Sequence, residues 1–229
     1  MSGINTFVSM KTRIFLSISI LCALSFGRQP EATASHAEAP RFSPTGNDLT
    51  ISYAIALTSK KDNTGIGETY NGGIETLFAG GRQARLRLVS LMRIQSVFVV
   101  LDNGQLKNVT LVKESGSSKH RKVLTPDQWR LYNKKYEGST CQLTQDTALI
   151  LKHICKKAII SLKGGRQMIA WYTPVIQKPI CSVLEPAFSA IPGLVLKYEY
   201  TYKKKTITYT ATTLSQNPIP AEIFAVPAD

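Results

Sequence analysis

Apolar and polar residues alternate along much of the chain after residue 48. In the segment 49–58 every second residue is apolar, which predicts a β-strand with one buried face. The residues of that face are Ile51, Tyr53, Ile55 and Leu57. The segment 82–91 alternates between apolar residues and arginines, which predicts an antiparallel strand with one face in water. The segment 94–101 is apolar and β-branched, which predicts a strand of the core.

Three hairpins are predicted after these strands. Asn103-Gly104 joins 94–101 to the next apolar segment, and Asn-Gly favours the tightest hairpin turn because both of its central residues need a positive φ. Gly164-Gly165 predicts a second hairpin. The third is indicated by alternating aromatic residues and threonines over 198–213, with Lys203-Lys204-Lys205 at its tip. The polar segments 60–73 and 115–122 are predicted as loops, and strands are expected again from Ala148 onward.

One helix is predicted around residues 125–137. Thr125 and Gln128 form a capping box, with proline at the first helical position, and Gly138 ends the segment. Trp129, Tyr132 and Tyr136 follow at helical spacing, so their stripe is expected to pack on the sheet. The pattern therefore predicts a mainly β, α+β fold with a curved antiparallel sheet and this helix packed on it.

The N-terminus has the pattern of a secretory signal. Lys11 and Arg13 precede an apolar run over 14–26, and Ala32-Thr33-Ala34 forms a cleavage site. We expect a signal peptide over 1–34, a flexible leader over 35–48 and a single β-rich domain over 49–229. The protein is then periplasmic or secreted.

Two alternatives at the N-terminus stay open. Translation could start at Met1 or at Met10, and Cys22 could carry a lipid, although the small residue that usually precedes a lipidated cysteine is missing. The apolar run is short for a transmembrane helix, and no other segment could span a bilayer, so an integral membrane protein is not expected.

The formal net charge of +13 narrows the class of partner. The basic residues are scattered, which is typical of solvated strand ends, but an exported protein of this charge is also attracted to anionic surfaces. The candidate partners are lipid, lipopolysaccharide or an outer-membrane protein. No nucleic acid is expected, because the chain has no nucleic-acid-binding motif and carries an export signal.

Three motifs in the last third of the chain resemble those of the GLPGLI family of bacterial envelope proteins. They are Cys155-Lys156-Lys157-Ala158, Trp171-Tyr172-Thr173-Pro174 and Ile191-Pro192-Gly193-Leu194-Val195-Leu196. The segment 180–186 departs from the family, which often has Gly-Pro before the last motif. The resemblance implies an exported protein without an established activity, and more distantly the open half-barrel of lipoprotein carriers.

The residues of these motifs and of the helix are the candidates for a ligand site. They are Trp129, Tyr132, Trp171, Tyr172, Ile191, Pro192, Gly193 and Leu194. Pro192-Gly193 is equally interpreted as a tight corner of the fold, and Trp171 is expected in the core beside Ile191 and Leu194. A disulfide between Cys155 and Cys181 is expected because both flank the family-like block, which leaves Cys141 unpaired.

Candidate chemistry is sparse. His153 and Cys155 share a strand face and could ligate one metal, but two ligands do not make a site. No hydrolase, phosphate-loop or zinc-protease motif is present, and no cofactor is expected. We therefore expect a non-enzymatic envelope protein that binds an apolar or amphipathic ligand or an envelope partner. The alternatives are a structural accessory that docks an outer-membrane transporter or assembly without a small ligand, and an unrecognised enzyme.

Overall fold

The computed structural model describes residues 48–59, 69–177, 181–202 and 205–227. The expected signal peptide and nearly all of the expected leader lie outside the described residues, as do Lys203 and Lys204. Within the described residues no helix is both long and apolar enough to cross a membrane.

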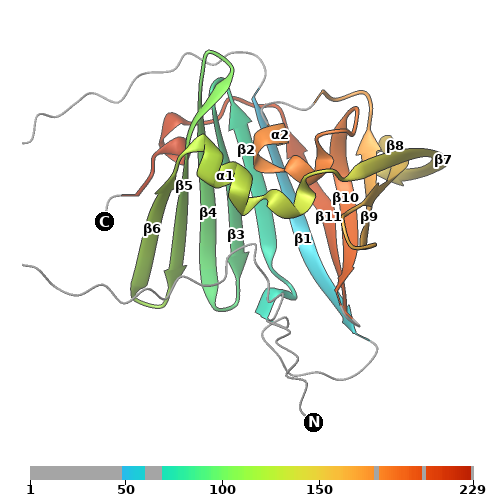
Figure 1. Cartoon of the computed structure of the whole chain (residues 1–229), viewed down its shortest axis with the longest axis horizontal. Coiled ribbons are helices and arrows are strands. Elements are labelled where there is room, and N and C mark those ends of the chain that lie inside the picture. The colour runs from blue at the N-terminus through green and yellow to red at the C-terminus, as the bar shows by residue number, and fades with distance from the viewer. Residues whose placement is uncertain (1–47, 60–68, 178–180, 203–204, 228–229) are drawn as a thin grey trace, which may run out of the picture. The chain divides into compact units, whose positions relative to one another are not determined.

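The described residues form a mainly β fold with one antiparallel sheet of eleven strands, in the order β6-β5-β4-β3-β2-β1-β11-β10-β9-β8-β7. The strands are β1 (Leu49–Ser59), β2 (Ile74–Gly80), β3 (Gln83–Ser90), β4 (Arg93–Asp102), β5 (Gln105–Ser115), β6 (Ser118–Leu124), β7 (Thr140–Ile150), β8 (His153–Ser161), β9 (Gln167–Thr173), β10 (Leu194–Tyr202) and β11 (Lys205–Ser215). The sheet is open and curved (Figure 1), as the sequence predicts.

Short helical segments connect the strands. They are α1 (Pro126–Tyr132), η2 (Lys134–Tyr136), α2 (Cys181–Leu184), η3 (Pro186–Phe188) and η4 (Ala221–Phe224). Strands β6 and β7 are the two edges of the sheet, and the chain between them crosses one face through α1 and η2 (Figure 1). We call this the inner face. Segments α2 and η3 lie on the same face, between β9 and β10 in sequence, so both helical connections cover it.

The inner face holds the core. On β1 the buried residues are those that the alternation predicts, among them Ile51, Tyr53 and Ile55. Register places Ile55 beside Tyr209 of β11, which pairs with Tyr198 of β10. The ring of Tyr53 on β1 lies 5.9 Å from that of Tyr198, so aromatic rings from three strands meet at the centre. The first and last strands pair with each other, and the centre of the sheet therefore depends on contacts that are distant in sequence.

The outer face is covered in part by the C-terminal segment. The guanidinium of Arg85 donates a hydrogen bond to the carbonyl of Ile223 at 3.1 Å and lies 4.8 Å from the ring centroid of Phe98. The backbone N–H of Ile219 donates to the carboxylate of Asp48 at 2.8 Å. These contacts hold η4 against β3.

The local signals for turns and caps are confirmed. Asn103 and Gly104 both have a positive φ, of 49° and 78°, at the turn between β4 and β5. The capping box also forms: the N–H of Gln128 donates to Oγ1 of Thr125, and the N–H of Thr125 donates to Oε1 of Gln128. The α-helix is shorter than expected, because it ends at Tyr132 and continues only as the 3₁₀ turn η2.

Two predictions at the edges of the sheet are wrong. The segment 115–122, predicted as a loop, contains most of strand β6, and β7 begins at Thr140 rather than near Ala148. Both strands are sheet edges with most side chains in water, so they lack the apolar alternation that reveals a half-buried strand. Strand β2 begins at Ile74, directly after the segment 60–73 that was predicted as a loop.

Trp171 does not lie in the core, which corrects the expectation above. The buried side of β9 is formed by Met168, Ala170 and Tyr172, and Trp171 lies half-buried on the opposite side. Its strand neighbour is Lys197, not Ile191. The period-two pattern had separated these two faces correctly, but the wrong one was assigned to the core because tryptophan is usually the more buried residue.

Candidate functional site

The site begins with the orientation of helix α1. Its cap fixes the first turn, and this turns Trp129 toward the sheet, where it is buried. The indole Nε1–H donates a hydrogen bond to the carbonyl of Val183 at 2.9 Å, and the Asn133 side-chain amide donates to the Trp129 carbonyl at 3.1 Å. The indole therefore joins α1 to α2, and both helical connections are held at a fixed separation.

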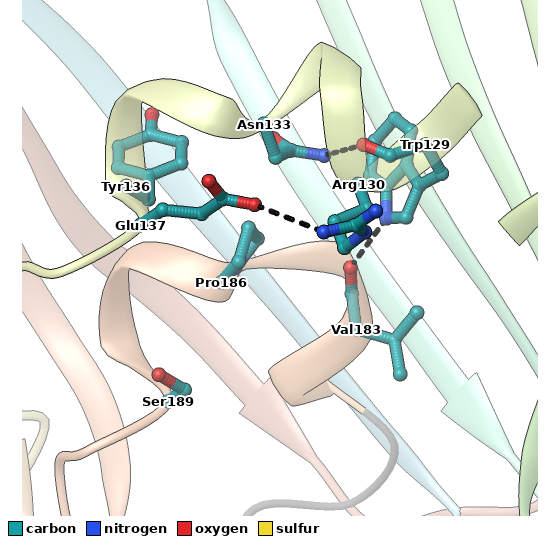
Figure 2. Close-up of a pocket in the computed structure, with 8 residues that line it drawn as sticks. All are labelled: Trp129, Arg130, Asn133, Tyr136, Glu137, Val183, Pro186 and Ser189. Atoms are coloured by element: carbon teal, nitrogen blue, oxygen red, sulfur yellow. Dashed lines mark hydrogen bonds and ion pairs between the residues drawn. The ribbon is translucent and has the colours of Figure 1, made fainter. Parts of the chain in front are cut away.

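A pocket of about 300 Å³ lies between the pair α1–η2 and the pair α2–η3 (Figure 2). Apolar and aromatic groups come from both pairs, and polar groups lie among them. The lining residues are Trp129, Arg130, Asn133, Tyr136, Glu137, Val183, Pro186 and Ser189. Such a mixture of an apolar wall and few polar groups is typical of small-molecule sites.

The charged side of the pocket is an ion pair. The guanidinium of Arg130 lies 3.7 Å from the carboxylate of Glu137 and 3.8 Å from that of Asp127. Figure 2 shows the Glu137 carboxylate directed across the pocket toward Arg130. Both partners are largely in water, so the pair is weak and can exchange for contacts with a ligand. The pocket thus offers a cation and an anion beside an aromatic wall.

The aromatic wall extends into a desolvated region. Burial raises the pKa of the Tyr136 hydroxyl well above its usual range, so this group stays a neutral donor and acceptor. Next to it, burial lowers the pKa of Lys135 to about 8, with repulsion from Arg166 acting in the same direction. The Lys135 ammonium lies 4.6 Å from the centroid of the Tyr136 ring.

Beneath the helices the inner face is filled by aromatic side chains. Phe188 of η3 contacts Tyr198 edge to face at 5.0 Å, and Tyr198 stacks on Tyr209 at 4.3 Å. The Tyr53 ring lies 5.9 Å from Tyr198, and its hydroxyl donates to the carbonyl of Val195 at 2.7 Å. At these residues the space that a half-barrel would offer to a long lipid chain is occupied by the protein itself.

Glu75 is buried in this aromatic cluster. Its carboxyl accepts a hydrogen bond from the Tyr198 hydroxyl at 2.8 Å. Burial raises the pKa of Glu75 to about 7, although the hydrogen bond from Tyr198 acts in the opposite direction. The same burial, together with the nearby Glu75, raises the pKa of Tyr198. The cluster is therefore neutral below about pH 7 and acquires one buried negative charge above it.

Of the eight candidates from the sequence, Trp129 alone lines this pocket. Tyr132 stacks on the outside of Trp129, with ring centroids 5.4 Å apart, and is partly exposed. Trp171 contacts the Lys157 ammonium at 5.9 Å, away from the helices, and Tyr172 is buried in the sheet. These side chains do not form one site with Trp129.

The segment 191–194 is a corner of the fold. Ile191 and Leu194 are buried, Pro192 is exposed, and Gly193 lies against the carbonyl of Thr173 with a φ of +154°. A Cβ atom at Gly193 would collide with that carbonyl oxygen. Close approach of two backbones explains the glycine without any ligand.

Cys155 is a free, buried thiol in the structure, and the side chain of Cys181, its expected disulfide partner, lies outside the described residues. The Sγ of Cys155 lies 3.6 Å from the carbonyl of His153 as a weak donor. The pairing of Cys155 with Cys181 stays a prediction. Within the described part of the chain no three His, Cys, Asp or Glu side chains are placed to hold a metal ion.

Sequence reasoning missed most of the pocket. Asn133 and Glu137 follow Trp129 at intervals of four and eight residues, so helical spacing could have placed them on one side of α1–η2. Val183, Pro186 and Ser189 had no such signal. Val183 lies in the four-residue helix α2, which is too short to show a period, and Pro186 and Ser189 follow it.

Comparison with known proteins gives likenesses of structure only: no family model matches the chain, and no curated protein matches it. The solved structure of PNGF-II is 15% identical with a TM-score of 0.42, and the chain spans only 29% of its length while 77% of the chain is covered. Lipoprotein LppX of Mycobacterium tuberculosis is 10% identical, covers 75% of this chain and 88% of its own, and has a TM-score of 0.37. A β-barrel-like protein of the domain of unknown function DUF1849 from Brucella abortus is 10% identical, covers 76% and 99%, and has a TM-score of 0.39.

Proposed function

We propose that this protein is a non-catalytic binding protein of the bacterial cell envelope and that it holds a small amphipathic ligand between its two helical connections. The observation that carries the proposal is the pocket of about 300 Å³, which has an aromatic wall at Trp129 and an ion pair at Arg130 and Glu137. The apolar body of the ligand lies on the indole, and its polar head replaces contacts within the ion pair.

The volume of the pocket limits the ligand. About 300 Å³ is at the lower end of the range of small-molecule sites. The aromatic cluster of Tyr53, Tyr198 and Tyr209 fills the centre of the inner face below it. A single short chain or an aromatic ring system fits this space, and a two-chain lipid does not.

The envelope location rests on the secretory signal over 1–34 and on the resemblance to GLPGLI proteins in the segments 155–158, 171–174 and 191–196. Both features are properties of the sequence. The role as a binding protein rests on the pocket and would hold in any compartment.

The experiment uses Trp129 as a built-in reporter. The chain has two tryptophans, and Trp171 lies away from the pocket, so Trp171→Phe leaves Trp129 as the sole indole. N-phenyl-1-naphthylamine, an uncharged aromatic probe, is titrated against this variant. We expect saturable energy transfer from Trp129 to one bound probe molecule.

Two neighbouring substitutions form a matched pair. Ser189→Phe introduces a ring into the pocket, whereas Ala190→Phe introduces the same ring at the next exposed residue, which does not line it. In the Trp171→Phe background we expect Ser189→Phe to weaken probe binding at least tenfold and Ala190→Phe to leave it unchanged. Equal binding in both variants would place the probe elsewhere and refute the pocket. Absence of binding in the parent would favour the structural accessory.

A further inference from the structure

The turn between β3 and β4 presents apolar side chains to solvent. It consists of Leu91 and Met92, whose side chains are 86% and 58% exposed. Two-residue hairpin turns usually carry glycine, asparagine or aspartate, because these residues suit the backbone and are soluble. A leucine and a methionine at this position therefore call for an explanation other than turn formation.

Three hydrogen bonds within the protein hold this turn and the residues that flank it. The Leu91 N–H donates to the carbonyl of Thr69 at 3.3 Å. The Ser90 hydroxyl donates to the Arg93 carbonyl, and the Ser115 hydroxyl donates to the Met92 carbonyl, both at 3.2 Å. In water these carbonyls would have solvent partners, but in an apolar phase each unsatisfied group would be costly. The Leu91 N–H and the Met92 carbonyl therefore need no partner from solvent when the turn meets an apolar phase.

The outer face behind the turn is ordered in rows. Register places Ile74, Val89 and Ile94 side by side across β2, β3 and β4, and the same row continues to Glu114 on β5 and Lys119 on β6. Ile74 is 52% exposed. The next row in the same register contains Arg87 on β3 and Arg121 on β6. Residues two apart on a strand are separated by about 7 Å. The apolar row is thus followed, at that depth, by arginines.

The charge of this corner of the sheet has one dominant sign. Strands β3 to β6 place six cationic residues around the turn against the single acid Glu114. The cationic residues are Arg87, Arg93, Lys113, Lys119, Arg121 and Lys122. The β3–β4 and β5–β6 turns lie together at the lower end of the sheet in Figure 1.

We propose that the β3–β4 turn inserts into an anionic lipid bilayer, with Leu91 and Met92 at the acyl boundary and the cationic side chains behind them at the headgroups. On the outer face Lys119 lies in the row about 7 Å behind the tip, and Arg87 and Arg121 lie in the row about 13 Å behind it, so cationic side chains follow the apolar tip at headgroup depth. The charge of the corner selects anionic over zwitterionic headgroups. The surface is separate from the pocket, so this proposal does not depend on the ligand.

The test locates the turn relative to the lipid. Leu91→Trp is compared with Leu149→Trp in the full chain; Leu149 is also a highly exposed leucine, but it lies in the hairpin β7–β8 at the other edge of the sheet. Vesicles contain phosphatidylethanolamine and phosphatidylglycerol with brominated acyl chains, which quench only nearby indoles. Both variants share the N-terminal segment, Trp129 and Trp171, so their difference reports the turn alone.

We expect the emission of Leu91→Trp to shift to the blue and to be quenched beyond the level of the parent, whereas Leu149→Trp matches the parent. In cosedimentation, Leu91→Ser combined with Met92→Ser should weaken binding to the anionic vesicles at least tenfold, and Leu149→Ser with Ile154→Ser should not. Vesicles of phosphatidylcholine should show no additional quenching of Leu91→Trp.

Equal quenching of the two tryptophan variants would overturn the proposal, and so would the absence of quenching in both, as expected if the corner binds an acidic protein. Ser189→Phe should leave vesicle binding unchanged, which separates this result from that of the pocket.

Discussion

Replacing the buried acid Glu75 by glutamine should change how the stability of the fold depends on pH. The carboxyl is 6% exposed and has the Tyr198 hydroxyl as its hydrogen-bond donor. Burial raises its pKa from an ordinary value of 4.5 to about 7. Glutamine has nearly the same shape and keeps an oxygen that can accept from Tyr198, but it cannot ionise. The substitution therefore removes the titration and little else.

The sign of the effect follows from proton binding. Between about pH 4.5 and pH 7 the folded protein keeps the Glu75 proton, whereas the unfolded chain releases it, so the free energy of unfolding falls as pH rises. Each pH unit of this window is worth about 1.4 kcal/mol. The free energy of unfolding falls by about 3 kcal/mol in total across this window. This loss is complete above pH 7 and has not begun below pH 4.5. Glu75→Gln avoids this loss, so it should equal the parent near pH 4.5 and exceed it by about 3 kcal/mol at pH 8.

Urea unfolding followed by circular dichroism at half-unit steps from pH 4.5 to pH 8.5 measures this directly. The control is Glu199→Gln on β10, whose residue neighbours Tyr198 in sequence but lies on the other side of the strand. It should follow the pH profile of the parent. A constant difference between Glu75→Gln and the parent across the whole range would show that Glu75 ionises equally in the folded and unfolded states, and the burial argument would fail.

Three further substitutions test the packing. Gly193→Ala should cost about 3 kcal/mol in urea unfolding, because its Cβ meets the Thr173 carbonyl, whereas Gly165→Ala, at a φ of +74° with open space around it, should cost about 1 kcal/mol. Similar losses of unfolding free energy in the two variants would contradict the close approach of Gly193 to the Thr173 carbonyl. Tyr53→Phe should cost about 1–2 kcal/mol in the same assay, since it leaves the Val195 carbonyl without the buried hydroxyl; an unchanged midpoint would mean that this bond contributes nothing. The unfolding free energy of Trp171→Phe should stay within about 1 kcal/mol of the parent, because the side chain is half-buried on the side of β9 opposite to the core. A loss of several kcal/mol would show that Trp171 packs in the core.

The sequence predicted those parts of the fold that depend on local signals. The turn at Asn103-Gly104, the capping box at Thr125 and the alternation of β1 each follow from interactions within a few residues. The pairing of β1 with β11 has no local signal, because it joins segments about 150 residues apart. Edge strands β6 and β7 were hard to predict for another reason. Solvent contacts both of their faces, so their sequences lack the alternation of apolar and polar residues that identifies a strand.

The candidate site was less accessible to sequence reasoning than the fold. Trp129 could be predicted because the helical spacing of the aromatic residues is apparent from the sequence itself. Its hydrogen-bond partner is the backbone carbonyl of Val183. Every residue has such a carbonyl, so the identity of the side chain at position 183 does not predict the contact. The buried acid Glu75 was also not singled out as special, since its environment comes from Tyr198, which lies more than a hundred residues away.

The central claim is that the pocket beside Trp129 holds a small amphipathic ligand. Native mass spectrometry of protein purified without detergent from its own envelope tests this most directly, with Ser189→Phe and Ala190→Phe prepared in parallel. The account predicts one bound molecule, smaller than a two-chain phospholipid, on the parent and on Ala190→Phe, and none on Ser189→Phe. Protein without a bound molecule in all three preparations, or the same bound molecule on Ser189→Phe, would contradict it.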